Sequence, residues 1–544
     1  MEKNQYEKAK SLCLPTQKIN LNWPREIESI CPVCIKPLTA KIYEKDNKIF
    51  MEKTCEKDGE FKECLSDDAI FFKRNELLTF EDDWGHEKPI TKHVKCPTSC
   101  GICNQHIGTP CLVNIDLTNR CNMKCPVCFA NSNAAGYVYE PNLEQVKTMI
   151  KAATALRPVP APAIQYSGGE PTLSPIWFDA LKMAKDLGVS HVQAASNGIT
   201  FAKVPGFAKK SKEAGLDTVY LQFDGTDDEA YRYTRKISNL FHIKEKAIEE
   251  IGKAGMTVCL VATIVGGESS KYIGDIIKYA INHEYVTSVS LQPVSFTGRM
   301  DPEERKKMRF TLTDLARESE KQTNGMIKKY DWYPMSVVSP FSRLLDVLQP
   351  KKDGTRHLIA ASHAHCGLAS YLCVNKKTKE AVPFPRFLDI AGVASYVNDL
   401  AKKLENKSKI GKSLSALKAL AGIKKYFIPE NAPKGMKFRD LLKFLKVFFG
   451  EGDENREAYN KMPWRMIFLA SMHFQDSYTF EVERIQRCSI YYCSPDGKIY
   501  PFCSYNVGPY FRDHVEKKFS VPIKEWVKNR TKEGVTQGFY EGKV

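Results

Sequence analysis

Cys121-Asn-Met-Lys-Cys125-Pro-Val-Cys128 is the most informative stretch of this chain. Three thiolates in the spacing C-x3-C-x2-C fit three irons of a cubic 4Fe–4S cluster within one short loop. No cysteine follows closely after Cys128, so this spacing leaves the fourth iron open to bind a small molecule. The apolar–polar alternation of residues 112–117 predicts a strand directly before the loop. The loop is therefore expected at the carboxyl end of a strand, where β/α folds place their active sites.

Strands and helices are predicted to alternate downstream of this loop. Apolar alternation and glycine stops predict strands at 163–166, 191–196, 218–223, 257–265 and 288–293, and helices at 176–187, 207–214, 239–254 and 273–283. Together with the first strand, these elements make six β/α units. The pattern predicts an α/β fold, with a partial (β/α)6 barrel over residues 112–300.

A second group of cysteines stands upstream of the barrel. Cys96, Cys100 and Cys103 repeat the spacing C-x3-C-x2-C, and Cys111 follows as a candidate fourth ligand. Four cysteines in sixteen residues predict a fully ligated 4Fe–4S cluster over residues 91–111, with zinc as the alternative.

The first ninety residues are expected to form a separate metal module. Cys31-Pro-Val-Cys34 places two thiolates on a tight turn, and Cys55 and Cys64 follow across a hairpin-like segment. Four thiolates suit one mononuclear iron, as in rubredoxin, or one structural zinc, and the spacing does not separate the two metals. Cys64 is the weakest member, because its spacing from Cys55 is looser than C-x2-C.

The bulk properties are those of a folded protein with several domains. The chain has 544 residues, of which 43% are hydrophobic and 26% charged, and it has no run of about 18 apolar residues and no signal peptide. Its 18 cysteines favour metal sites in a reducing cytoplasm over disulfides. The net charge of +16 indicates an anionic partner or, equally, a lysine-rich surface of the kind found in thermophiles.

A third cysteine group lies beyond the barrel, in residues 301–544. It comprises Cys366, Cys373, Cys488, Cys493 and Cys503. The segment from Cys493 to Cys503 contains Pro-Asp-Gly and resembles the SPASM/twitch type of auxiliary-cluster domain. Five cysteines compete for four positions: we expect Cys366, Cys488 and Cys503, completed by Cys373 or Cys493.

A basic insertion over residues 393–450 interrupts this last group. Residues 402–446 contain thirteen Lys or Arg and only three Asp or Glu. Residues 438–449 place apolar side chains at helical spacing, which predicts a helix with one apolar and one basic face. Such a helix suits a membrane interface with anionic lipid, or it packs its apolar face on the protein core.

Further motifs along the strands carry a family resemblance. Tyr166-Ser-Gly168-Gly169-Glu170-Pro171 follows the second strand, and the third and fourth strands end in Ser196-Asn197-Gly198 and Gln222-Phe223-Asp224-Gly225. In this order, and after the three-cysteine loop, they resemble the radical S-adenosylmethionine superfamily. The position before the third cysteine, usually aromatic in that superfamily, is Val127 here, with Phe129 just after.

This resemblance implies the chemistry of the site. The open cluster would chelate the amino and carboxylate groups of S-adenosylmethionine and cleave its sulfonium C–S bond by one electron, giving a 5′-deoxyadenosyl radical that abstracts hydrogen. The cofactor-binding residues implied are Phe129, Gly168, Gly169, Glu170, Ser196, Asn197, Gln222, Asp224 and Arg235. Glu170 would accept from the ammonium of the cofactor, and Arg235 would meet its carboxylate.

The order of parts over the full length closely resembles the archaeal tetraether lipid synthases. This implies three 4Fe–4S clusters, one mononuclear iron or zinc, and C–C coupling of isoprenoid chains of diether phospholipids through their terminal methyl carbons. It also implies peripheral attachment at the inner face of the membrane, an electron donor such as a ferredoxin or flavodoxin, and no nucleic-acid partner. Alternatives are a C-methyltransferase acting on a pterin in methanopterin biosynthesis, a peptide-modifying enzyme, and a non-catalytic electron-transfer protein.

Overall fold

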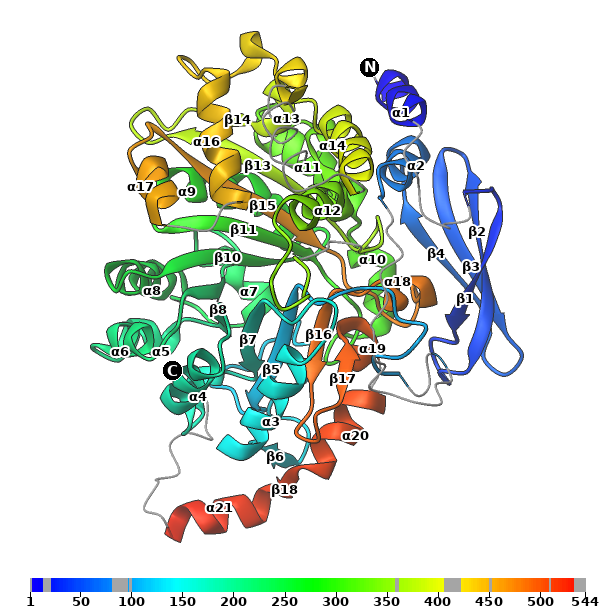
Figure 1. The fold of residues 1–544 in the computed structure, drawn as a ribbon. Helices are drawn as coiled ribbons and strands as arrows, with labels where there is room; N and C mark the ends of the chain where they lie inside the picture. The colour runs from blue at the N-terminus through cyan, green and yellow to red at the C-terminus, as the bar shows by residue number, and fades with distance from the viewer. Residues whose placement is uncertain are drawn as a thin grey trace.

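The computed structural model describes residues 2–12, 21–80, 96, 100–357, 362–405, 422–449, 453–507 and 510–532. A small antiparallel sheet forms the N-terminal module, to the right in Figure 1. Its four strands pair in chain order: β1 (Arg25–Ile30), β2 (Pro37–Lys45), β3 (Lys48–Cys55) and β4 (Gly59–Ser66). Ile42, Ile49 and Met51 alternate with exposed residues and pack on Phe72 of α2 (Ala69–Leu77), so one face of the sheet is a small core.

Buried ion pairs join this module to the rest of the molecule. Glu63 of β4 accepts from Arg305 at 2.7 Å and from Arg309 at 2.9 Å. Arg74 of α2 donates to the carbonyl of Trp332 at 2.7 Å. Charged groups this deeply buried need partners, so these contacts fix the orientation of the module on the main body.

A twelve-stranded sheet forms the centre of the molecule (Figure 1). Six neighbouring strands within it are parallel and follow chain order. They are β5 (Leu112–Thr118), β7 (Ala163–Gly168), β8 (His191–Ser196), β9 (Thr218–Gln222), β10 (Thr257–Ile264) and β11 (Val286–Pro293). The strands predicted from the sequence are confirmed, because apolar alternation and glycine stops marked each of them.

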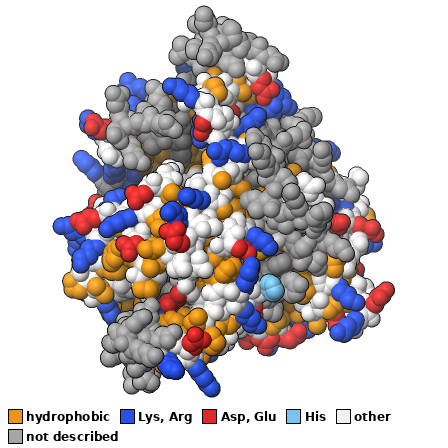
Figure 2. All heavy atoms as spheres, turned by 60° about the horizontal axis from the view of Figure 1, so that its bottom comes forward, with side chains coloured by type: hydrophobic (Ala, Val, Ile, Leu, Met, Phe, Trp, Pro, Cys, Tyr) orange, Lys and Arg blue, Asp and Glu red, His pale blue; other side chains and the backbone are white. Residues whose placement is uncertain are grey.

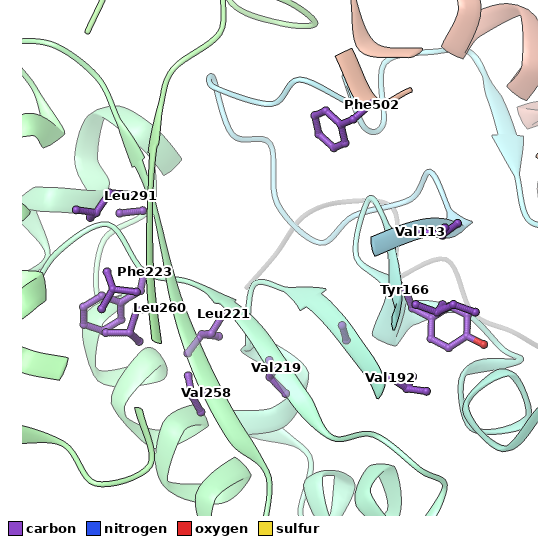
Figure 3. Close-up of a cluster of buried hydrophobic side chains, with 14 of the residues drawn as sticks. Val113, Tyr166, Val192, Val219, Leu221, Phe223, Val258, Leu260, Leu291 and Phe502 are labelled. Atoms are coloured by element: carbon purple, nitrogen blue, oxygen red, sulfur yellow. The ribbon is translucent and has the colours of Figure 1, made fainter. Parts of the chain in front are cut away.

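Apolar side chains of these strands face the covering helices. Val113, Tyr166, Val219, Leu260 and Leu291 are fully buried in one continuous core, and the labelled strand residues of Figure 3 belong to it. The covering helices are α3 (Leu143–Thr154), α4 (Trp177–Asp186), α6 (Phe207–Glu213), α8 (Phe241–Lys253) and α9 (Ile273–Asn282). Helix α3 begins at a capping box between Asn142 and Gln145, which satisfies its first backbone donors.

The opposite face of the same strands is polar. Successive side chains of a strand point to opposite faces, so the residues between the apolar ones share the inner face. They form hydrogen-bonded chains across neighbouring strands: Gln193 donates to Gln165 at 2.6 Å, and Gln165 donates to Asn114 at 2.7 Å. This face of the sheet therefore presents a row of hydrogen-bonding groups.

Segments that follow residue 300 extend the central sheet at both ends. β15 (Trp464–Met472) pairs in parallel with β11, and β13 (Gly367–Asn375) pairs antiparallel with β15. At the other end β16 (Ile490–Cys493) pairs in parallel with β5, and β17 (Ile499–Pro501) pairs antiparallel with β16. This pairing places Cys493 of β16 beside β5, the strand that precedes the three-thiol loop.

The basic insertion packs its apolar face inward where the structure describes it. α14 (Ile390–Glu405) and α16 (Phe438–Phe449) form the helical part, and residues 406–421 lie outside the described residues. Leu441 and Phe444 are fully buried in a cluster with Phe387 and Trp464. The predicted helix is present. Because these two residues of its apolar face are covered by the protein core, they are not available to a membrane, contrary to what the membrane interpretation required.

None of the helices in the described ranges combines the length and the hydropathy needed to span a bilayer. Lysine and arginine side chains are interspersed with acidic and hydrophobic ones on the face that Figure 2 shows.

Replacing Phe444 by Ala tests the packing of α16. Removal of a fully buried phenyl ring is expected to lower the free energy of unfolding by about 3–5 kcal/mol, measured by denaturant titration. Lys443→Ala, at an exposed position of the same helix, is the matched control and should change it by less than about 0.5 kcal/mol. Unchanged stability of Phe444→Ala together with weaker binding to anionic vesicles would contradict the packing.

Candidate active site

The three-thiol loop follows β5 and is held from two sides. On one side, Asn133 accepts from the backbone N–H of Cys121 at 3.0 Å and donates to the carbonyl of Cys121 at 2.8 Å. On the other, Arg299 donates to the carbonyl of Cys125 at 2.8 Å. Gly298 lies so close that a Cβ there would stand 2.5 Å from the carbonyl oxygen of Cys128. Neither Arg299 nor Asn133 was predicted, because both act through backbone contacts that carry no motif.

Two glycines at the end of β7 pack directly against the start of this loop. A Cβ at Gly168 would stand 2.1 Å from the carbonyl oxygen of Thr118, and one at Gly169 would stand 2.1 Å from that of Arg120. The φ of Gly168 is +127°, which side-chain-bearing residues rarely adopt. Backbone N–H groups of Gly169 and Glu170 donate to Thr118 and Arg120 at 2.7 and 2.8 Å. Gly168 and Gly169, expected from the resemblance to bind the cofactor, thus let the backbone of β7 approach the cluster loop itself.

The Glu170 carboxylate ties the ends of β7 and β8 together. It accepts from the hydroxyl of Thr172 at 2.7 Å, from the hydroxyl of Ser196 at 2.8 Å and from the backbone N–H of Asn197 at 2.8 Å. Complete burial raises the pKa of Glu170, while these hydrogen bonds oppose the rise. The Asn197 amide in turn donates to Asn122 of the loop at 2.7 Å. Glu170, Ser196 and Asn197, predicted as cofactor residues, therefore form one network with the thiol loop.

A second buried carboxylate, Asp224, anchors Arg235. The guanidinium donates to Asp224 at 2.6 and 3.0 Å and to the hydroxyl of Thr263 at 3.1 Å, and Gln222 also donates to Asp224, at 2.8 Å. Burial by itself would lower the pKa of Arg235, but Asp224 and the thiol of Cys125 outweigh it, so the pKa is raised. The structure brings Gln222, Asp224 and Arg235 together and places Arg235 beside a cluster ligand.

Lys244 is a member of the site that the sequence analysis missed. Its ammonium group is fully buried and donates to the backbone carbonyl of Asn197 and, at 2.7 Å, to the side chain of Gln222. Burial and the neighbouring Arg235 lower the pKa of Lys244 to about 7. It lies one turn into α8, where a lysine at a helical position gives no signal of burial.

The donor chemistry of the loop suits an iron–sulfur cluster. Burial, the Glu170 carboxylate and the Cys125 thiol raise the pKa of Cys121. A thiolate at this position therefore needs positive charge beside it, which iron supplies when it is bound. Phe129, predicted to contact the cofactor, is 39% exposed, and its ring is tilted against that of Phe502 with centroids 5.7 Å apart.

Three cysteines of the C-terminal group gather at one place. Burial raises the pKa of the Cys488 thiol, and the nearby thiols of Cys503 and Cys366 raise it further. Arg484 lies beside Cys366 and Cys503. The two candidates for the fourth position lie elsewhere. Cys373 packs in the core beneath α16, and the thiol of Cys493 donates to the carbonyl of Met149 at 3.3 Å.

The upstream cysteines form another group. Burial and then Cys100 and Cys103 raise the pKa of Cys96 to about 12, so these three thiols are neighbours. Cys111 contacts the C-terminal segment: its backbone N–H donates to the carbonyl of Ser489, next to Cys488, at 2.8 Å. Its role as fourth ligand of the upstream group stays a prediction.

In the N-terminal module, Asp58 joins the cysteines. Ligand atoms of Cys31, Cys34, Cys55 and Asp58 all lie within 4.8 Å of one another. The Asp58 carboxylate accepts from Cys31 at 3.1 Å and from Cys55 at 3.3 Å. Cys64 instead donates to the carbonyl of Ser66 at 3.4 Å. The spacing Cys55-x2-Asp58 mirrors Cys31-x2-Cys34, a signal that the cysteine count alone overlooked.

A further group of potential ligand atoms comprises His363, Glu481 and Glu483. Burial strongly lowers the pKa of His363, and the nearby positive charges of Arg484, Arg487 and Arg25 lower it further. This concentration of positive charge disfavours a cation there.

Substitutions in the N-terminal module test its ligand set. Asp58→Ala is expected to lower the zinc or mononuclear iron bound by the module in the full-length protein, because one of the gathered ligands is lost. Cys64→Ser is the matched control and should keep the metal, as measured by elemental analysis together with the visible spectrum. Loss of metal from Cys64→Ser but not from Asp58→Ala would contradict the geometry.

The C-terminal group predicts a difference between its cysteines. Cys488→Ala is expected to lower the iron content of the reconstituted protein by about four atoms, one cubic cluster. Cys373→Ala and Cys493→Ala should leave the iron content unchanged, because neither thiol lies with the other three. A loss of similar size in either control would show that the protein rearranges when it binds the cluster.

Comparisons with known proteins agree with this site. The radical SAM superfamily matches residues 115–280, and the HMPTM N-terminal zinc ribbon domain matches residues 23–67. Among solved structures, SuiB of Streptococcus suis bound to S-adenosylmethionine is 16% identical with a TM-score of 0.32, over 40% of this chain and 48% of that one. A GTP 3′,8-cyclase of Limosilactobacillus fermentum is 24% identical over 34% of this chain and 54% of its own length.

A relative matches nearly the whole chain. The 7,8-dihydro-6-hydroxymethylpterin dimethyltransferase of Methanocaldococcus jannaschii is 39% identical over 507 residues, which cover 92% of this chain and 96% of the relative. The prediction of a tetraether lipid synthase is therefore wrong, because this near full-length relative is a pterin dimethyltransferase and the zinc ribbon match fits it. The chain belongs to the radical S-adenosylmethionine superfamily and, within it, to the family of this pterin dimethyltransferase.

Proposed function

We propose that this protein is a radical S-adenosylmethionine enzyme that adds methyl groups to the ring of a dihydropterin. The observation that carries the proposal is the similarity to the pterin dimethyltransferase over 92% of this chain. The match of residues 23–67 to the HMPTM N-terminal zinc ribbon domain also supports it, in a part of the chain separate from the residues that serve cofactor chemistry.

The inner face of the central sheet supports a polar substrate. Asn114, Gln165, Gln193, Tyr220 and Gln292 face inward and are linked by hydrogen bonds to their neighbours. A hydrocarbon chain against this wall would leave amide and hydroxyl groups without water or partners, at a cost of about 1–3 kcal/mol each. A pterin ring carries amide and amino groups that can replace the lost water.

The residues around the thiol loop have distinct tasks in this proposal. Glu170 and Asn197 hold the loop in register with the strand ends, while Arg235, fixed by Asp224, offers positive charge to the cofactor carboxylate. Lys244 adds a second buried cation between Asn197 and Gln222. When bound, the reduced cluster and S-adenosylmethionine supply the radical that activates carbon.

The remaining metal groups complete the proposal. The six parallel strands make up the partial barrel, and the Cys96 and Cys366 groups hold auxiliary 4Fe–4S clusters. An external electron-transfer protein reduces the cluster at Cys121, Cys125 and Cys128. The mutual proximity of the thiols in each group supports this assignment.

The reaction itself can be tested anaerobically. Because cleavage of S-adenosylmethionine to 5′-deoxyadenosine leaves its methyl group on methionine, the reaction also receives a separate one-carbon donor, such as a reduced pterin or folate that carries a methylene group. Protein reconstituted with iron and sulfide, then given reductant, S-adenosylmethionine, this donor and 7,8-dihydro-6-hydroxymethylpterin, should yield a pterin heavier by one or two methyl groups by mass spectrometry. Cys125→Ala, which removes a thiol of the open cluster, is the control and should yield none. Cleavage of S-adenosylmethionine to 5′-deoxyadenosine with the pterin unchanged would contradict pterin methylation.

A further inference from the structure

Three inward-facing side chains form a compact hydrogen-bonded group on β9 and β11. The Tyr220 hydroxyl donates to the Ser290 hydroxyl at 2.6 Å. The Gln292 amide donates to the Tyr220 oxygen at 2.8 Å and to the Ser290 oxygen at 3.3 Å. Each of these residues alternates with fully buried apolar neighbours such as Leu221 and Leu291, so all three belong to the inner face.

The strand register places this group beside the cofactor-binding residues. Gln292 pairs with Thr263 across β10 and β11, and Thr263 accepts from Arg235. Tyr220 stands two residues before Gln222, which contacts Asp224 and Lys244. Two residues along a strand span about 6.6–6.8 Å, so Tyr220 lies one inner-face layer below Gln222, whereas Gln292 is level with Thr263 beside the charged network.

The group has one unused acceptor. Both hydrogens of the Gln292 amide nitrogen are directed to Tyr220 and Ser290, whereas its carbonyl oxygen, Oε1, has no hydrogen-bond partner within the described ranges. Gln292 is only partly buried, so this oxygen can be reached from the enclosed space. Because Tyr220 and Ser290 hold the nitrogen, the amide orientation is fixed with Oε1 outward.

An aromatic pair lies on the next strand of the same face. Ser288 of β11 pairs with Phe468 of β15, which pairs with Tyr371 of β13. The rings of Phe468 and Tyr371 have centroids 4.8 Å apart, and both side chains are partly buried. Ser288 lies four residues before Gln292, about 13 Å along β11, so this aromatic pair lines the inner face farther from the cofactor end.

We propose that Gln292, oriented by Tyr220 and Ser290, is the specificity-determining residue that accepts a hydrogen bond from the amide or amino edge of the pterin. This inference rests on the proposed function and assigns the substrate's recognition edge within the same site. Loss of one such hydrogen bond, with a buried donor left unpaired, weakens binding about tenfold or more.

The test is equilibrium binding of 7,8-dihydro-6-hydroxymethylpterin to the reconstituted full-length protein under anaerobic conditions. Gln292→Met keeps the length of the side chain and removes the acceptor, so the affinity should fall at least about tenfold. Gln349→Met is the matched control: Gln349 is exposed just after α12 (Ser339–Leu348), outside the inner face, and should keep wild-type affinity. Iron content and S-adenosylmethionine binding should be unchanged in both.

Tyr220→Phe provides a second variant. This substitution removes one hydroxyl and frees the Gln292 amide to rotate, so it should weaken pterin binding. It tests the same inference if Gln292→Met fails to take up its clusters. Wild-type affinity in both Gln292→Met and Tyr220→Phe would overturn the inference and leave the proposed function standing. Absence of pterin binding by the wild-type protein would overturn the proposed function and this inference with it.

Discussion

The close backbone contact between β7 and the thiol loop is the constraint on which the site depends. Gly168 and Gly169 have no room for a side chain because the carbonyl oxygens of Thr118 and Arg120 occupy it. Two backbone hydrogen bonds, at 2.7 and 2.8 Å, then fix the loop to the neighbouring strand end. A loop that carries three metal ligands is thereby positioned by main-chain geometry, which is less yielding than side-chain contacts.

Buried charged side chains surround that contact. Glu170 joins the strand ends through its carboxylate, and Asp224 does the same for Gln222, Thr263 and Arg235. Lys244 lies between the two networks and keeps a pKa of about 7 because burial opposes its charge. Two carboxylates and two cations in a water-poor space give the site a preorganised field, which favours a zwitterionic ligand such as the methionine end of the cofactor.

Much of this arrangement could be predicted from the sequence because it depends on local patterns. Strand alternation located β5 and β7–β11, and cysteine spacing located Cys121, Cys125 and Cys128. Residues that act through space were missed: Lys244 and Arg299 carry no spacing signal, and Asp58 stands where only cysteines were counted. Periodicity identified α16 as amphipathic, but it cannot tell whether Phe444 faces lipid or protein. The superfamily motifs describe cofactor binding, so they carry no information about the substrate. The polarity of the inner wall becomes evident only when neighbouring strands are placed in register.

One reaction decides the central claim, that the polar inner wall selects a heterocycle. Reconstituted protein would receive S-adenosylmethionine, reductant, a one-carbon donor, a dihydropterin and an archaeal diether phospholipid together, and both substrates would be examined by mass spectrometry. The pterin is expected to gain the mass of one or two methyl groups, and the lipid should stay unchanged. Coupled lipid with an unmodified pterin would contradict selection of a heterocycle by the polar wall.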